Sequence, residues 1–326
     1  MYKKWLTLFL IFGVLVAGYT ARIYGKPDTA ITAEEIQNPN DAKNKEAIAQ
    51  KVLTSTGREG QFDMGDATNV NVYYGDVLLG DSQDAIISVK FGPKNTIVAA
   101  YTPNGEIYEF VAEVGEDFYD VRNIQFIPVK DLGNSVVIVK QYADQKLGAI
   151  EENTFFKGYR YKDGKFDMVL DTPEDIKASW NKLWDLEGIQ DENNWQKVDQ
   201  KTESKWEESD NPALNLVRNQ RFSISDDKGQ NLPQDETFQT ENERIVTQKF
   251  YWSDEWGRFI LGEKQDKTTG QKVAVVEDFQ ASPYVLTGDV YNKTRILRKD
   301  GTYDIVDNDT LTDISQTRVE PVFQTI

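Results

Sequence analysis

The chain has 326 residues, 54 acidic and 37 basic side chains, a formal net charge of −17, and neither cysteine nor histidine. This composition excludes disulfides, thiolate nucleophiles, Cys/His zinc sites, iron–sulfur clusters and Ser-His-Asp triads. No nucleic-acid partner is expected, because proteins that bind nucleic acids carry a basic surface, whereas this chain is acidic. Hydrophobic residues (39%) and aromatic residues (12%) suffice for a packed core, which argues against a disordered chain.

The N-terminal residues 1–25 have the pattern of an export element. Lys3 and Lys4 precede an apolar run from Trp5 to Tyr19, which is typical of a signal peptide. Counted to Tyr24, the stretch is about 20 residues long, which is enough for a membrane anchor with Arg22 at the interface. Because no clear cleavage site follows, two alternatives stay open. One is a single-pass membrane protein with its body outside the cell, and the other is a protein secreted after signal cleavage. Only this segment is expected to contact the membrane.

Residues 26–60 are polar and predict two short helices. Thr32 and Glu35 have the spacing of a capping box, and Asn38-Pro39-Asn40 interrupts the helical pattern before Ala42 to Leu53. We interpret this segment as a helical stalk close to the membrane.

Two β-rich regions are expected, residues 61–172 and 213–326. Their short runs of β-branched and aromatic residues are separated by Gly, Asn and Asp turns. The runs follow one another too closely for crossover helices, so the sheets should be antiparallel. The expected strands are 69–74, 85–91, 96–101, 106–111, 123–129, 135–142, 154–161, 165–170, 221–225, 244–252, 258–261, 272–276, 284–286, 294–297 and 303–306.

Between these regions, residues 173–212 predict a short helical insert that contains tryptophan. Thr172-Pro173 resembles a helix start, and Ile176, Trp180 and Trp184 then follow helical spacing. We expect the tryptophan face to pack on the β core. An aromatic platform for a ligand is the alternative.

Four stretches share the pattern of a strand, a polar turn with glycine, and a second strand. They are Tyr159–Leu170, Phe250–Leu261, Arg295–Val306 and, more loosely, Ala100–Val111. Asp-Gly and Asn-Gly favour type I′ turns, because both central residues need positive φ. The stretches are therefore expected to be hairpins, either as true repeats or as ordinary parts of antiparallel sheets.

Two acidic segments that lead into apolar strands, Gly80–Ile87 (GDSQDAII) and Val129–Val139 (VKDLGNSVVIV), resemble the FG-GAP/VCBS type of β-propeller repeat found in bacterial cell-envelope proteins. The resemblance implies blades of antiparallel strands and acidic loops that hold Ca²⁺.

The one metal site that the sequence suggests lies in the same region. Asp76, Asp81 and Asp84 fall on one turn between two expected strands, and carboxylate oxygens are the ligands that Ca²⁺ prefers. The alternative is a turn of solvated acids. No catalytic residue can be nominated, because acidic residues are so numerous that pairs arise by chance.

These observations favour a non-enzymatic binding or interaction protein of the cell envelope, outside the cytoplasm, with an envelope protein or polysaccharide as partner. The acidic charge would keep such a body soluble. The alternative is a secreted hydrolase that acts on polysaccharide through carboxylates. A cleft with two carboxyl groups, one of raised pKa, would favour the enzyme.

Overall fold

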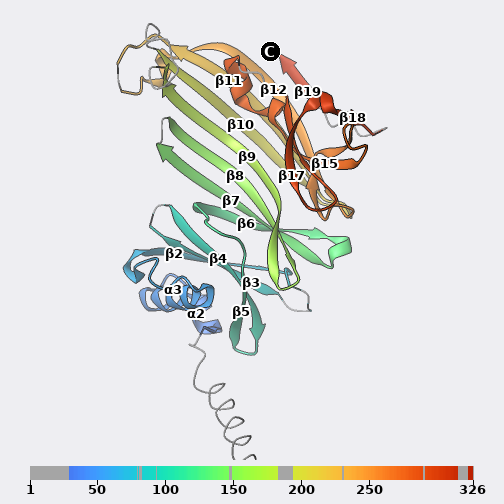
Figure 1. Cartoon of the computed structure of the whole chain (residues 1–326). Helices are drawn as coiled ribbons and strands as arrows, with labels where there is room; N and C mark the ends of the chain where they lie inside the picture. The colour runs from blue at the N-terminus through green and yellow to red at the C-terminus, as the bar shows by residue number, and fades with distance from the viewer. Residues whose placement is uncertain are drawn as a thin grey trace, which may run out of the picture.

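The computed structural model describes residues 29–78, 80, 83–92, 94–146, 149–182, 194–229, 231–288, 291–314 and 322–325. Their strands form three antiparallel sheets of five, nine and five strands (Figure 1). This confirms the prediction of a mainly β chain with antiparallel sheets. Residues 1–25 lie outside the described residues, and within the described part no helix is long and apolar enough to cross a membrane.

The first sheet carries the helices. Its order is β1-β5-β4-β3-β2, and α2 and α3 pack against one of its faces. Its elements are β1 (Ile31–Thr32), α2 (Ala33–Gln37), α3 (Ala42–Thr56), η1 (Met64–Asp66), β2 (Ala67–Gly75), β3 (Asp84–Phe91), β4 (Asn95–Asn104) and β5 (Ile107–Glu113).

The second sheet is built from long strands that pair in chain order from β6 to β13, and β19 pairs with β12. Figure 1 shows these strands curving across the upper part of the molecule, above the first sheet and its helices. The elements are β6 (Asp120–Val129), η2 (Lys130–Leu132), β7 (Asn134–Lys146), β8 (Ile150–Lys162), β9 (Lys165–Asn181), β10 (Trp195–Glu207), β11 (Ala213–Ser225), η4 (Asp235–Thr237), β12 (Gln239–Ser253), β13 (Arg258–Ile260) and β19 (Val322–Thr325).

The third sheet, which we call the C-terminal sheet, has the order β17-β16-β15-β14-β18. Its elements are β14 (Gly262–Asp266), β15 (Lys272–Asp278), η5 (Phe279–Ala281), η6 (Pro283–Thr287), β16 (Lys293–Leu297), β17 (Tyr303–Asp307), η7 (Asn308–Thr310) and β18 (Leu311–Asp313).

Strands of the nine-stranded sheet such as β7 are buried on both faces, because alternate side chains pack into two different hydrophobic clusters, and this explains their continuous apolar runs. On β7, Val137 and Val139 pack toward the first sheet, whereas Val136 and Ile138 pack in the cluster that includes Val275 of the C-terminal sheet. A strand that is buried on both faces reads as an unbroken apolar stretch.

The polar segment 26–60 contains the two helices α2 and α3, after the short strand β1, and the predicted capping box forms. Thr32 Oγ1 accepts a hydrogen bond from the Glu35 amide, while the Glu35 carboxylate accepts one from the Thr32 amide. The helices are not a free stalk, because Ile48 and Val52 of α3 are fully buried against the first sheet.

The helical insert is wrong in its described part. Residues 165–181 form strand β9 and residues 195–207 form strand β10. Thr172, Glu174, Ile176 and Ala178 are all buried, which is a period of two and not of 3.6. Pairing with β8 and β10 along this length outweighs the helical spacing of the isolated segment. Trp184 lies outside the described residues.

All four predicted hairpins form, as β4–β5, β8–β9, β12–β13 and β16–β17. Only Asp163-Gly164 has positive φ at both turn residues, at 51° and 85°. At Gly105 and Gly301 the glycine alone has positive φ, so the type I′ prediction holds only between β8 and β9.

Two further expectations need correction. The described strands form sheets of five, nine and five, and in the nine-stranded sheet each strand from β6 to β13 pairs with the next, so they are not arranged as separate blades. The family resemblance itself stays a prediction.

Residues 284–286 form part of the short helix η6 and not a strand, because Pro283 begins the helix and the Ser282 hydroxyl caps the Tyr284 amide.

Candidate ligand-binding cleft

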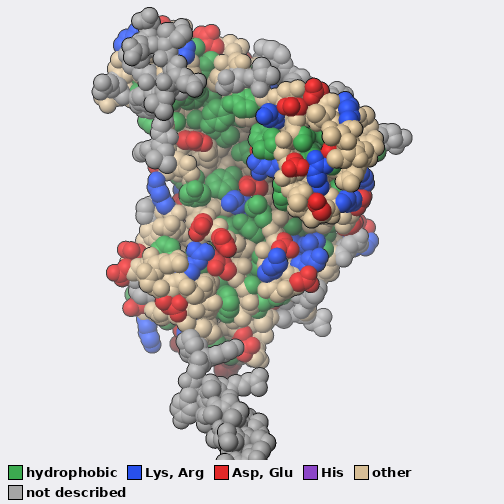
Figure 2. Space-filling model, in the orientation of Figure 1, with side chains coloured by type: hydrophobic (Ala, Val, Ile, Leu, Met, Phe, Trp, Pro, Cys, Tyr) green, Lys and Arg blue, Asp and Glu red, His purple; other side chains and the backbone are tan. Residues whose placement is uncertain are grey.

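A cleft of about 410 Å³ lies between the nine-stranded sheet and the C-terminal sheet. Residues 168–171 of β9 line one wall, and Tyr303 to Ile305 of β17 line the facing wall. A second hollow of about 220 Å³ adjoins it and shares Asp171, Phe250 and Glu277 with it. Figure 2 shows hydrophobic side chains, with charged ones among them, on the face of the nine-stranded sheet beside the C-terminal sheet.

The rim of the cleft exposes large apolar side chains. Met168, Tyr303 and Ile305 are 44%, 48% and 54% exposed, and among the described residues they are three of five large apolar side chains with such exposure. Phe250 and Phe259 continue the apolar lining inward. An exposed apolar patch beside a concave site is the ordinary mark of a binding surface.

Two carboxyl groups face this cleft from different sheets. Burial raises the pKa of Glu277 on β15, and the charge of Asp171 raises it further, although Arg295 opposes both effects. Arg295 Nε lies 3.3 Å from Glu277 Oε2. Burial by the surrounding protein also raises the pKa of Asp171, even though this residue is accessible from the cleft. The site therefore holds two acids that ionise less readily than usual.

A buried arginine lines the adjoining hollow. Arg218 on β11 is 3% exposed and lines the adjoining hollow. Its guanidinium donates to Gln248 Oε1, to Thr172 Oγ1 at 2.8 Å and to the Pro173 carbonyl at 3.0 Å. Among the described residues no carboxylate lies within ion-pair distance of it. Desolvation lowers the pKa of Arg218 to about 10, so it stays charged at neutral pH.

A second arginine stands at the mouth. Arg258 on β13 donates from Nη2 to the Met168 carbonyl at 3.2 Å, and its guanidinium lies 5.1 Å from the centre of the Tyr303 ring. It therefore joins the nine-stranded sheet to β17. Burial and the neighbouring Arg160 lower the pKa of Arg258 to about 10.

A buried polar network holds the loop after β15 against the nine-stranded sheet. Gln220 Nε2 donates to Gln200 Oε1 and to the Ala281 carbonyl, both at 2.7 Å. Arg244 donates from Nη2 to the carbonyls of Gln280 and Ser282. Since η5 follows directly after β15, and residues of η5 and η6 line the adjoining hollow, these bonds fix one wall of that hollow.

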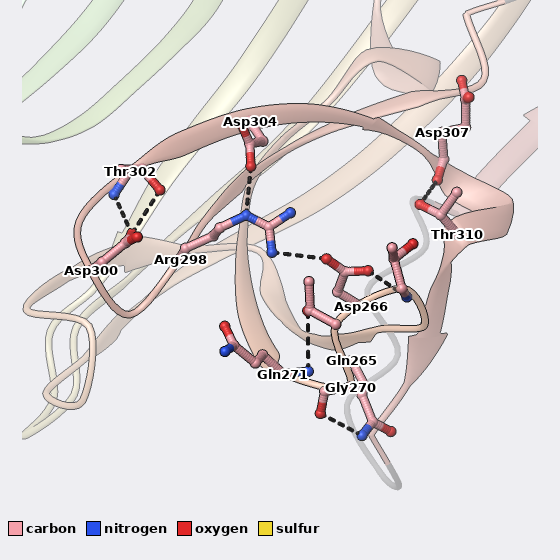
Figure 3. A network of polar contacts seen from close by, with 12 residues as sticks. Gln265, Asp266, Gly270, Gln271, Arg298, Asp300, Thr302, Asp304, Asp307 and Thr310 are labelled. Carbon is pink, nitrogen blue, oxygen red and sulfur yellow. Dashed lines mark hydrogen bonds and ion pairs between the residues drawn. The ribbon is translucent and has the colours of Figure 1, made fainter.

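The strand β17 is anchored within its own sheet by one arginine, as Figure 3 shows. Arg298 donates from Nε to Asp304 Oδ2 at 2.5 Å and from Nη1 to Asp266 Oδ2 at 2.8 Å. The pKa of Asp266 is lowered to about 2, chiefly by the hydrogen bond from Arg298. This network ties the turn after β14 to the β16–β17 hairpin.

The predicted calcium ligands lie elsewhere and are not brought together in the described part. Asp84 is buried, and its Oδ2 accepts hydrogen bonds from the amides of Val77 and Leu78 at 3.1 and 2.7 Å. Asp76 is exposed, and Asp81 lies outside the described residues. No group of three acidic side chains that could hold a metal occurs among the described residues.

The sequence reasoning missed the cleft, although one signal was present. On β11, Leu214, Leu216 and Phe222 are buried, and Arg218 and Gln220 fall on the same alternating positions. Charged and amide side chains at inward positions of a strand indicate a buried polar site.

Comparison with known proteins gave no relative: no protein-family model, no curated protein and no solved structure matches this chain.

Proposed function

We propose that this chain is a binding module of the cell envelope and that the cleft is its ligand site. The observation that carries the proposal is the apolar rim of Met168, Tyr303 and Ile305 around a cleft with a charged interior. A large apolar surface left in water is unfavourable by about 25 cal/mol per Å², and a ligand that covers it recovers this free energy.

The proposed place of action rests on the N-terminal sequence pattern. A basic start and an apolar run predict export, with the body either tethered outside the membrane or secreted. A net charge of −17 would discourage adsorption to anionic lipid or polymer and leave contact to a specific site. The partner is then an envelope protein or a polysaccharide.

A retention assay tests the binding function. Full-length chain is immobilised in detergent and exposed to an envelope extract of the cells that make it, and retained peptide and sugar are measured. The cleft variant Met168→Asp/Ile305→Asp should retain at least about tenfold less. The control variant Tyr74→Asp/Leu232→Asp changes apolar side chains of similar exposure (46% and 40%) that do not line the cleft, and it should behave as wild type. Equal retention by both variants would refute the proposal.

A second function, the carboxylate-dependent hydrolase, is supported by one specific observation. Asp171 and Glu277 line the same cleft, and the pKa of each is raised. A protonated carboxyl group beside an ionised one is the arrangement that glycoside hydrolysis needs. Release of reducing ends from purified cell-wall polysaccharide, abolished by Asp171→Asn and by Glu277→Gln, would support the enzyme. No release by the wild-type chain would remove it.

A further inference from the structure

The strand β17 has a free backbone edge beside the cleft. It stands at the end of the C-terminal sheet and pairs only with β16 among the described strands. Every residue of β17 except Val306 is exposed. An edge strand of this kind offers unpaired amides and carbonyls to any extended chain that comes alongside.

The register identifies which backbone groups are free. The amide of Arg298 bonds to the Thr302 carbonyl, and the amide of Asn308 bonds to the Asn292 carbonyl. In an antiparallel pair, hydrogen-bonded and non-hydrogen-bonded positions alternate. The backbones of Asp304 and Val306 therefore face β16, whereas those of Tyr303 and Ile305 face outward.

The same two residues carry the exposed apolar side chains of the cleft. Tyr303 and Ile305 thus combine outward backbone groups with side chains that line the cavity opposite Met168. Beyond them the pairing edge ends, because the Asp307 carbonyl already accepts a hydrogen bond from Thr310 Oγ1 at 2.6 Å. The free edge therefore suits a short extended segment.

We infer that the cleft binds an extended polypeptide segment of an envelope protein, which adds as a strand to the free edge of β17 and places apolar side chains between Tyr303, Ile305 and Met168. The inference rests on the proposed binding function and names its ligand class. Main-chain hydrogen bonds supply affinity in such complexes, and side-chain pockets supply specificity. A single strand suits the space better than a folded second copy, because the edge opens on a cleft of about 410 Å³ walled by β9.

The test is a peptide selection with a backbone-specific variant. A phage-displayed library of random dodecapeptides is selected on the full-length chain, and the enriched peptides are assayed on Ile305→Pro and Ile305→Val. Proline removes the outward amide but no bond to β16, whereas valine keeps the amide and a similar volume. We expect Ile305→Pro to weaken binding at least about tenfold and Ile305→Val less than about threefold. N-methylation along the peptide should abolish binding at every second position only.

Three results would overturn the inference. The first is that the library enriches no peptide, and the second is that the enriched peptides bind Ile305→Pro and Ile305→Val equally. The third is that the wild-type chain is a dimer and Ile305→Pro a monomer, since a second copy of the chain would then occupy the edge of β17. If the envelope extract is still retained through the cleft but as polysaccharide, the inference fails while the proposed binding function stands. If Met168→Asp/Ile305→Asp retains as much of the extract as the wild-type chain, the proposed binding function is refuted, and the inference that rests on it is refuted as well.

Discussion

Replacing Arg218 by methionine should change stability little, although the residue is buried. The guanidinium has lost its water, and the lowering of its pKa from 12.5 to about 10 corresponds to about 3 kcal/mol against the charged form. Three acceptors, on Gln248, Thr172 and Pro173, would lose a donor at about 1 kcal/mol each. The two contributions nearly cancel, so we expect Arg218→Met to cost less than about 2 kcal/mol.

Urea unfolding followed by circular dichroism measures this change. Arg221→Met on the same strand is the control, because Arg221 is exposed and 3.7 Å from Glu243, and its loss should cost below about 1 kcal/mol. A loss of more than about 4 kcal/mol would show that the two contributions do not cancel and that the fold requires Arg218.

Three further outcomes are expected. The pKa of Asp266 is about 2 in the folded chain, against an ordinary value of 3.8, so its ionised form stabilises the fold above about pH 5 and this contribution is lost as the pH falls through 2. Asp266→Asn should therefore cost about 1–3 kcal/mol at pH 7 and well under about 1 kcal/mol at pH 2 in urea unfolding. The raised pKa of Asp171 has the opposite sign, so stability falls as the pH rises from the ordinary pKa through the raised one. Asp171→Asn should therefore raise the melting temperature at pH 7 but not at pH 3, and an unchanged or lower value at pH 7 would contradict this. If Asp76, Asp81 and Asp84 bind Ca²⁺ with a dissociation constant of about 1 mM, 10 mM calcium should stabilise the chain by about 1.4 kcal/mol, and melting with no shift would remove the site.

The strands could be predicted because their side chains follow local rules. Runs such as 85–91 and 135–142 are apolar enough to be buried on both faces, and glycine turns separate them. Where a local rule conflicted with pairing, pairing decided the result. Thr172-Pro173 has the local features of a helix start, yet β9 continues through it between β8 and β10.

The cleft could not be assembled from the sequence, because its parts come from separate strands. Asp171, Glu277 and Ile305 lie on β9, β15 and β17, and only the packing of two sheets brings them to one cavity. Without the order of the sheets, the many acids of this chain give no reason to pair Asp171 with Glu277. The one indication in the sequence was Arg218, which lies at an inward position of β11 and lines the hollow beside the cleft.

Site-specific photocrosslinking in intact cells tests most directly whether the cleft is the ligand site of an exported chain. A benzophenone side chain replaces Met168 at the rim or, as control, Tyr74, which is equally exposed on β2. We expect an adduct from position 168, on a body that external protease can reach, and none from position 74. Equal adducts from both positions, no adduct from position 168, or a body protected inside the cell would contradict it.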